Sequence, residues 1–126
     1  MARLGAWLPL RASSLGDWGA FLIGRRSLVA VVGRSMEPTL APGDRVWVDR
    51  RAYGDRDPEP GEIVLMRRPD QPDQVLIKRA IAPSASPDDS SGFWIMLGDN
   101  AAASTDSRHF GPVPRSHLLG QVVSRL

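Results

Sequence analysis

Short apolar runs separated by turn residues make up most of this chain. The runs are β-branched or alternate with polar residues, and they lie at 27–32, 45–49, 62–67, 74–81, 93–97 and 121–125. Closely spaced runs of this length, bounded by Pro, Gly, Asp and Ser, are typical of antiparallel strands. We therefore predict a mostly β fold with a single antiparallel β-domain, in which residues 82–91 form a polar loop.

The residues before the first strand have the pattern of a short helix over 14–24. Ser14 and Asp17 stand at the spacing of a capping box, which satisfies the first backbone N–H groups of a helix, and Gly24 can end it. The apolar residues that share one face are Leu15, Trp18 and Leu22. We expect this helix to pack on the domain through that face.

A second interpretation places the N-terminal segment, residues 1–26, on a membrane surface. Interfacial helices combine aromatic residues with basic residues at their edge, and here those residues are Trp7, Trp18, Phe21, Arg25 and Arg26. No apolar run approaches the ~18 residues of a membrane span, and the N-terminus lacks the pattern of a cleavable export signal. We expect a cytoplasmic protein with at most peripheral membrane contact, whose main domain spans 27–126.

Composition excludes several kinds of site. The chain has no cysteine, so disulfides and thiolate metal sites are excluded. Its two histidines, His109 and His117, are not clustered with carboxylates, so we expect neither a metal nor a cofactor. The net charge is only +2, and all 16 basic residues except Lys78 are arginines, which explains the high pI. We therefore expect no nucleic-acid partner.

The single lysine has an unusual position. Lys78 lies within an apolar run, and strand alternation places it on the face of Leu76, opposite Ile77 and Arg79. Most strand lysines extend their ammonium group into water, which is the simpler interpretation. In an apolar site, however, the pKa of an amine falls from about 10.4 toward about 7–8. A neutral amine can take the proton of a serine hydroxyl, which arginine cannot do at neutral pH.

Four segments resemble the type I signal peptidase family, in the same order. They are GRSMEPTLAPGD (33–44), GEIVLMRRP (61–69), VLIKRAI (75–81) and LGDNAAASTDSRHFGPVP (97–114). The resemblance covers about residues 30 to 115, most of the chain. It implies a β-domain of the signal-peptidase and repressor-peptidase type, and a serine endopeptidase with a Ser/Lys dyad and no cofactor.

The same resemblance implies roles for individual residues. The nucleophile is Ser35 and the general base is Lys78. The supporting residues, some of them beside the oxyanion hole, are Gly33, Met36, Ser104, Asp106 and Arg108. By analogy with the family, Ser104 orients the lysine amine, and Asp106 pairs with Arg108 to brace the last segment. Substrates are expected to bind extended along a strand edge, with small residues at the first and third positions before the cut.

The chain departs from larger members of that family in two ways. It has no membrane-spanning segment, and it lacks the Leu-Pro-Gly-Asp element and the longer insertion that follow the lysine segment in many members. In both respects it is similar to the small branch that matures nickel-type superoxide dismutase. In that branch a cytoplasmic precursor loses a short N-terminal leader. The expected partner is therefore a precursor protein with such a leader, and nickel superoxide dismutase is the expected one.

Three alternatives stay open on the sequence. A membrane-associated signal peptidase would act on exported preproteins. A Ser-His-Asp hydrolase would need His109 or His117 beside Ser35, although the Gly-x-Ser-x-Gly elbow of such enzymes is absent. A non-catalytic β-module would bind peptides as an added strand, but such a module has no reason to keep its only lysine at position 78.

Overall fold

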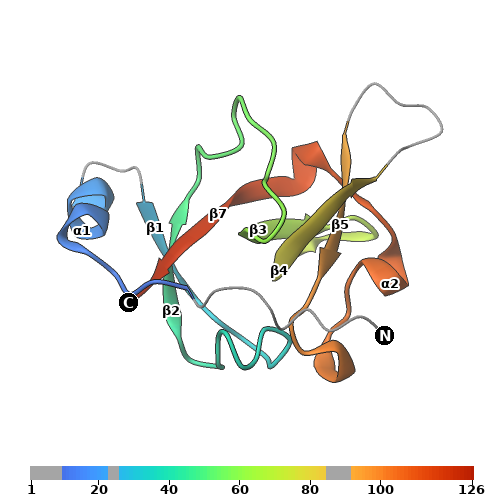
Figure 1. Ribbon diagram of the computed structural model, residues 1–126, viewed down its shortest axis with the longest axis horizontal. Helices are drawn as coiled ribbons and strands as arrows, with labels where there is room; N and C mark the ends of the chain where they lie inside the picture. Colours follow the sequence, from blue (N-terminus) through green and yellow to red (C-terminus); the bar gives the residue numbers. More distant parts are fainter. Residues whose placement is uncertain (1–9, 23–25, 85–91) are drawn as a thin grey trace.

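The computed structural model describes residues 10–22, 26–84 and 92–126 (Figure 1). Its elements, in chain order, are α1 (Leu15–Leu22), β1 (Arg26–Ala30), β2 (Arg45–Asp49), β3 (Ile63–Arg68), β4 (Gln71–Ser84), β5 (Phe93–Leu97), η1 (Ala101–Ala103), α2 (Ser107–Phe110), β6 (Val113–Pro114), η2 (Arg115–His117) and β7 (Leu118–Arg125). The strands form one sheet in the order β1-β2-β7-β3-β4-β5-β6, and neighbouring strands are antiparallel. The predicted mostly β fold with a single antiparallel domain is confirmed.

The strand bounds agree with the prediction where the signals are local. β2 and β5 have the predicted bounds. β4 is longer than predicted, because it pairs with β3 at its start and with β5 at its end, so it reaches Ser84. The first three residues of the expected loop 82–91 therefore belong to a strand, and the rest of that loop lies outside the described residues.

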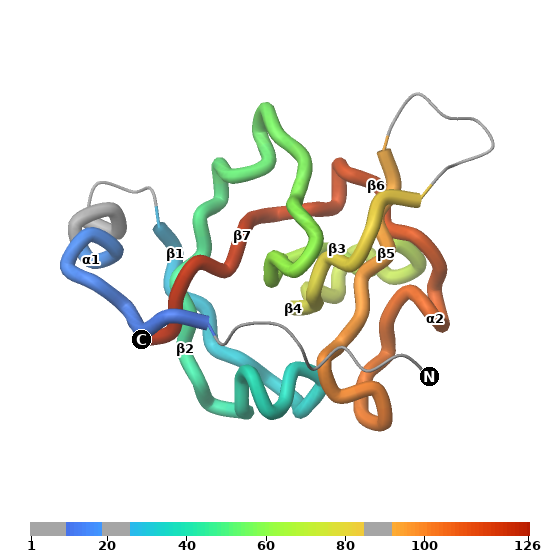
Figure 2. Tube along the Cα trace, viewed as in Figure 1, coloured from blue at the N-terminus to red at the C-terminus, as the bar shows by residue number. Residues whose placement is uncertain are grey.

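The C-terminal strand β7 runs between β2 and β3, so the end of the chain is built into the middle of the sheet (Figure 2). Two clusters of buried apolar side chains result. The first contains Val31, Met36, Leu40, Val46, Val48, Ile63, Leu65 and Val122, and the second contains Tyr53, Val64, Met66, Ala80, Trp94, Met96, Val113 and Leu118. Successive residues of β3 alternate between the clusters, which explains why this strand is apolar on both faces.

The N-terminal helix lies beside β1 at the end of the sheet, as Figure 1 shows. Its capping box is present: Ser14 N donates to Asp17 Oδ2 at 3.1 Å, and Asp17 N donates to Ser14 Oγ at 3.3 Å. Leu15, however, is 91% exposed, whereas Asp17 is buried. Trp18 contacts the buried Trp47 edge-on, with 4.9 Å between ring centroids. The predicted packing of Leu15 is therefore wrong, because Asp17 takes the buried position and finds polar partners on other elements.

The structure bears on only part of the predicted membrane dock. Trp7, Arg25 and the side chain of Phe21 lie outside the described residues. Arg26 forms ion pairs with two carboxylates of the protein, so its charge is already compensated. Within the described ranges, no helix has the length and apolar character needed to cross a membrane.

Gly120 on β7 is required by close packing between strands. A Cβ at this position would lie 2.7 Å from Asp49 O and 2.7 Å from Val48 Cγ1. Because β7 pairs with both β2 and β3, the strand has little freedom to move away. We expect Gly120→Ala to lower the free energy of unfolding by about 1–3 kcal/mol, measured by urea denaturation. Gly92→Ala is the control, since its Cβ would meet only Trp94 Nε1, at 4.0 Å, and an equal loss in both variants would contradict the explanation.

Candidate active site

Ser35 lies in a turn between β1 and β2. The chain enters this turn through Gly33, whose φ of 79° is in the left-handed region that favours glycine. Leu40 N donates to Met36 O at 2.9 Å, which closes the turn after the serine. Both Met36 and Leu40 are buried in the first apolar cluster. The serine is therefore followed directly by side chains that anchor the turn in the core.

The segment after β5 fixes the backbone of this turn. Asn100 N donates to Ser35 O at 2.8 Å, and Asn100 Nδ2 donates to Arg34 O at 3.1 Å. Gly98 permits the close approach, because a Cβ there would overlap Ser104 and would lie 2.7 Å from Ser35 O. The Gly-Asp-Asn segment thus binds the backbone carbonyl of Ser35, and these contacts do not involve the serine hydroxyl.

Lys78 is buried on β4, with 3% of its surface exposed. It pairs with Val64 of β3, and Leu76, on the same face of the strand, packs against the second apolar cluster, as the alternation predicted. Burial lowers the pKa of its amine to about 8, the negative charge of Asp106 opposes this shift, and the positive charge of Arg108 adds to it. The simpler interpretation, a lysine that extends into water, is wrong.

Ser35 and Lys78 line one small pocket of about 90 Å³. Its lining residues are Val29, Ala30, Val31, Val32, Ser35, Met36, Leu76, Ile77 and Lys78. Apart from the serine and the lysine the wall is apolar, which favours the uncharged amine and suits a small side chain. A larger hollow of about 350 Å³ lies over Ile63 and Val122 and is lined by neither of the two residues.

Asp106 lies at the centre of a buried hydrogen-bond network. Its carboxylate accepts from Ser104 Oγ at 2.7 Å, Gly98 N at 3.0 Å and Arg108 Nε at 2.9 Å. Burial raises the pKa of Asp106, but the hydrogen bonds outweigh it and lower the pKa to about 2. The predicted Asp106–Arg108 pair is therefore present. Because the Ser104 hydroxyl donates its hydrogen bond to Asp106, its oxygen can still accept one, and its role toward the Lys78 amine stays a prediction.

A second buried ion pair was not predicted. Arg79 contacts Asp99 through two hydrogen bonds, Nε to Oδ1 at 2.8 Å and Nη2 to Oδ2 at 2.7 Å. Thr39 Oγ1 donates to Asp99 Oδ2 at 2.6 Å, so the pair ties the serine turn to the residue that follows Lys78. The sequence did contain a signal for this pair: Arg79 lies in an apolar strand, and a buried charge requires a partner of opposite charge.

Both histidines lie away from the pocket. His109 Nδ1 accepts from Asp106 N at 3.2 Å in the capping box of α2, and His117 Nδ1 lies 3.3 Å from Arg67 O. The lining of the Ser35 pocket contains no histidine. The Ser-His-Asp alternative therefore has no support in this geometry. Across 10–22, 26–84 and 92–126, no cluster of three or more His, Cys, Asp or Glu side chains is suited to hold a metal ion.

Comparison with known proteins identifies relatives over most of the chain. The family described as signal peptidase, peptidase S26, matches residues 19–85 and 88–126. Mitochondrial inner membrane protease subunit 1 of Mus musculus is 32% identical over 116 residues, which cover 79% of this chain and 68% of that protein. Mitochondrial ATP-independent inner membrane protease subunit 1a of Arabidopsis thaliana is 36% identical over 118 residues, covering 79% and 70%. "Probable signal peptidase I-2" of Synechocystis sp. is 32% identical over 146 residues, covering 82% and 66%.

The family match includes the serine turn, the lysine strand and the segment after β5. It confirms the coarser part of the sequence-based expectation, while the relatives named above are inner membrane proteases and a signal peptidase rather than enzymes of nickel superoxide dismutase maturation. The chain belongs to the signal peptidase family, peptidase S26, and is a serine-type endopeptidase of the kind that acts on precursor proteins.

Proposed function

We propose that this protein is a Ser/Lys-dyad endopeptidase that removes a short N-terminal leader from a precursor protein. The observation that carries the proposal is the shared apolar pocket of Ser35 and the buried Lys78. The pKa of Lys78 is lowered to about 8, so half of the amine is uncharged at that pH and available as a general base. In this proposal residues 27–126 form the peptidase domain and residues 1–26 are its N-terminal segment.

The proposed reaction uses Lys78 twice. Its neutral amine takes the proton of Ser35 Oγ as the oxygen attacks the peptide carbonyl, and the ammonium then protonates the leaving nitrogen. Water attacks the resulting ester with Lys78 again as base, which releases the acid and regenerates the serine. The backbone N–H of Ser35, beside Gly33, donates to the oxyanion. The Ser104 oxygen accepts from the amine and directs its lone pair toward the serine.

The proposed substrate lies extended along the free edge of β1. Over the described residues β1 pairs with β2 alone, and β4 pairs with β5 only from Arg79 onward. The edge of β1 and residues 76–78 of β4 both line the pocket. Exposed strand edges bind extended peptides through main-chain hydrogen bonds. A pocket of about 90 Å³ suits the small residues expected near the cut.

For the physiological substrate we propose the cytoplasmic precursor of nickel-type superoxide dismutase. Support comes from the resemblance of the chain to the small maturation branch and from the small number of residues between β4 and β5. Only residues 85–92 separate these strands, in place of the longer insertion of larger members. The alternative, a membrane-associated signal peptidase for exported preproteins, takes support from relatives that are named as mitochondrial inner membrane proteases.

The dyad is tested by two substitutions. Ser35→Ala removes the hydroxyl, and Lys78→Arg replaces the base with a guanidinium that cannot become neutral. We expect neither variant to cleave a leader peptide, and we expect an acylating serine probe to label the wild type but not Ser35→Ala. Arg67→Lys, at an exposed position of the neighbouring strand, is the control and should remain active. Appreciable cleavage by Lys78→Arg would remove Lys78 from the mechanism, and absence of both cleavage and labelling in the wild type would favour the peptide-binding module.

Burial of Lys78 predicts a pH-dependent cost in stability. In the unfolded chain the amine titrates near 10.5, and in the folded protein near 8. Between these values the unfolded state binds more protons, so wild-type stability rises with pH, and below pH 8 the full cost of about 3 kcal/mol applies. We expect Lys78→Met to unfold at higher urea concentration than the wild type at pH 7, and the difference to shrink between pH 8 and pH 10.5. A difference that stays constant across this range would contradict a depressed lysine pKa.

The substrate proposal is tested with two precursors. A nickel superoxide dismutase precursor and an export preprotein are each incubated with the purified enzyme, and the new N-termini are identified by mass spectrometry. We expect a single cut that frees the mature N-terminus of the dismutase, no cut in the preprotein, and no cut in either with Ser35→Ala. Cleavage of the preprotein alone would favour the membrane-associated alternative.

A further inference from the structure

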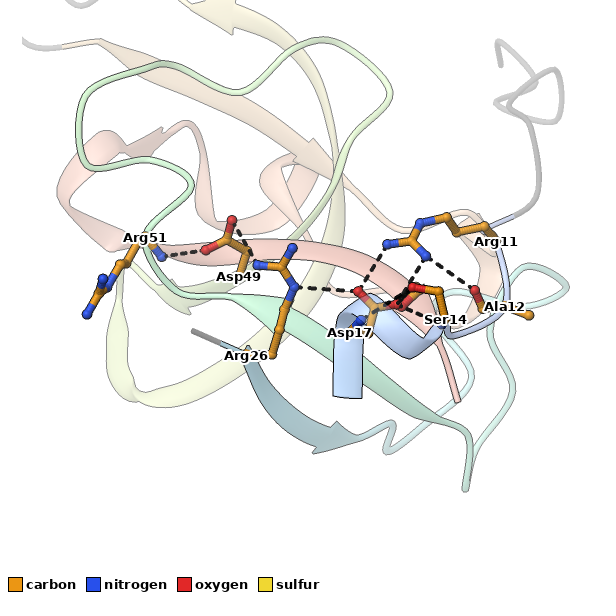
Figure 3. A network of polar contacts seen from close by, with 8 residues as sticks. Arg11, Ala12, Ser14, Asp17, Arg26, Asp49 and Arg51 are labelled. Atoms are coloured by element: carbon orange, nitrogen blue, oxygen red, sulfur yellow. Dashed lines mark hydrogen bonds and ion pairs between the residues drawn. The ribbon is translucent and has the colours of Figure 1, made fainter. Parts of the chain in front are cut away.

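One buried carboxylate joins the N-terminal helix to the start of β1 (Figure 3). Asp17 on α1 is 2% exposed and faces two arginines. Arg11 donates to it from Nη1 at 3.0 Å and from Nη2 at 3.1 Å, and Arg26 Nε lies 3.6 Å from its Oδ1. Ser124 Oγ of β7 donates to the same carboxylate at 2.6 Å. Segments far apart in the sequence therefore meet at a single side chain.

The carboxylate of Asp17 is ionised at neutral pH. Burial raises its pKa, but hydrogen bonds from Ser124, Arg11 and the backbone N–H of Ser14 outweigh this effect and lower the pKa to about 2. Its two cations differ in exposure, since the side chain of Arg11 is 52% exposed and that of Arg26 only 21%. Arg11 makes the two hydrogen bonds to the carboxylate, whereas Arg26 forms an ion pair with it and is the less exposed, and therefore less screened, of the two cations.

Arg26 is the first residue of β1 and is held from two sides. Its Nη1 lies 3.2 Å from Asp49 Oδ2 of β2, and its backbone pairs with Asp49 in the sheet. In the described part of the chain, β1 has a strand on one side only. The end of an edge strand frays readily because few contacts oppose its opening. The carboxylates of Asp17 and Asp49 therefore fix the end of β1 that is farther from the serine.

The other end of β1 leads into the Ser35 pocket, which Val29 and Ala30 line. Arg26 precedes Val29 by three residues, a distance of about 10 Å along an extended strand. A peptide paired with the β1 edge would advance along it at nearly the same spacing. If the peptide runs parallel to β1, as the proposal requires, residues next to the cut would lie at the pocket, and residues several positions earlier would lie beside Arg26.

We propose that Arg26, held by Asp17 and Asp49, is a positioning residue that keeps the distal part of the β1 edge ordered for the substrate. The part of the edge that it orders would bind leader residues about four to six positions before the cut, which lie beyond the pocket. The inference rests on the proposed function, because it requires a substrate that extends along β1. It makes the length of the leader, and not only the small residues near the cut, part of what the enzyme recognises.

The experiment compares two variants that remove one cation each from the same carboxylate. Arg26→Gln removes the link to β1 and leaves Asp17 bonded to Arg11, Ser14 and Ser124. Arg11→Gln removes an equal charge without touching β1, so it is the matched control. Steady-state kinetics are measured for a peptide with roughly three residues before the cut and one with roughly six, identical after it, well below the melting temperature of each variant.

For Arg26→Gln we expect the KM of the longer peptide to rise about fivefold, which corresponds to ordering about one frayed residue on binding. Its kcat, and the KM of the shorter peptide, should stay at wild-type values, and Arg11→Gln should change neither KM. Asp49→Asn, which removes the charge of the other carboxylate that pairs with Arg26 and leaves Asp17 intact, should give a length-dependent rise in KM in the same direction.

Three outcomes would overturn the inference. The first is an equal rise in KM for both peptides in Arg26→Gln, and the second is the same rise in Arg11→Gln, since either would mean that the Asp17 network acts on stability alone. The third is a wild type that cleaves both peptides with the same KM, because no contact would then exist beyond the pocket. A wild type that cleaves neither peptide and resists the acylating probe would instead remove the proposed function, and the inference with it.

Discussion

The burial of one amine, that of Lys78, is the constraint on which the rest of the site depends. An ammonium ion in an apolar pocket is costly, and the protein can lower that cost either by pairing it with a carboxylate or by letting it lose its proton. Asp106, the acidic group whose charge acts on the lysine, is already bonded to Arg108, Ser104 and Gly98 N, so its charge is largely compensated. Burial is the main cause of the lowered lysine pKa, and Arg108 does more than brace a loop, because its positive charge opposes the effect of Asp106 and adds to this lowering.

The need to keep the lysine amine uncharged also explains why no ion pair is found among the described residues that line the pocket. A hydroxyl and an amine react only when both are held at fixed positions, so their supports have to be rigid. The Arg79–Asp99 pair and the Thr39 hydroxyl connect the serine turn to the lysine strand, and Asn100 binds the carbonyl of Ser35. None of these supporting residues lines the pocket. The wall that touches the amine remains apolar as a result.

The sequence predicted correctly those features that depend on neighbouring residues, and it missed features that depend on partners far away in the chain. β2 and β5 were predicted with correct bounds because turn residues and alternation within a few positions define them. The two-residue β6 was missed because it exists only through its pairing with β5. The burial of Asp17 and the Arg79–Asp99 pair were missed for the same reason, since their partners lie elsewhere in the chain. The burial of Lys78 was one of two interpretations of its strand, and the choice of Ser35 required the resemblance to a family.

An open strand edge is both the proposed binding surface and a weakness of this fold. Unpaired edges fray and attract unwanted strands, so proteins protect them with charges, short lengths or coverage. β1 has only five residues and ends in a pocket that accepts no more than a small side chain, so that pocket alone supplies little affinity. Ordering the far end of β1 in advance reduces the entropy lost when a peptide pairs with it. The charges that order this end of β1 belong to Asp17 on α1 and Asp49 on β2, so the buried aspartate of the N-terminal helix has a role in the sheet that the apolar pattern of the helix does not indicate.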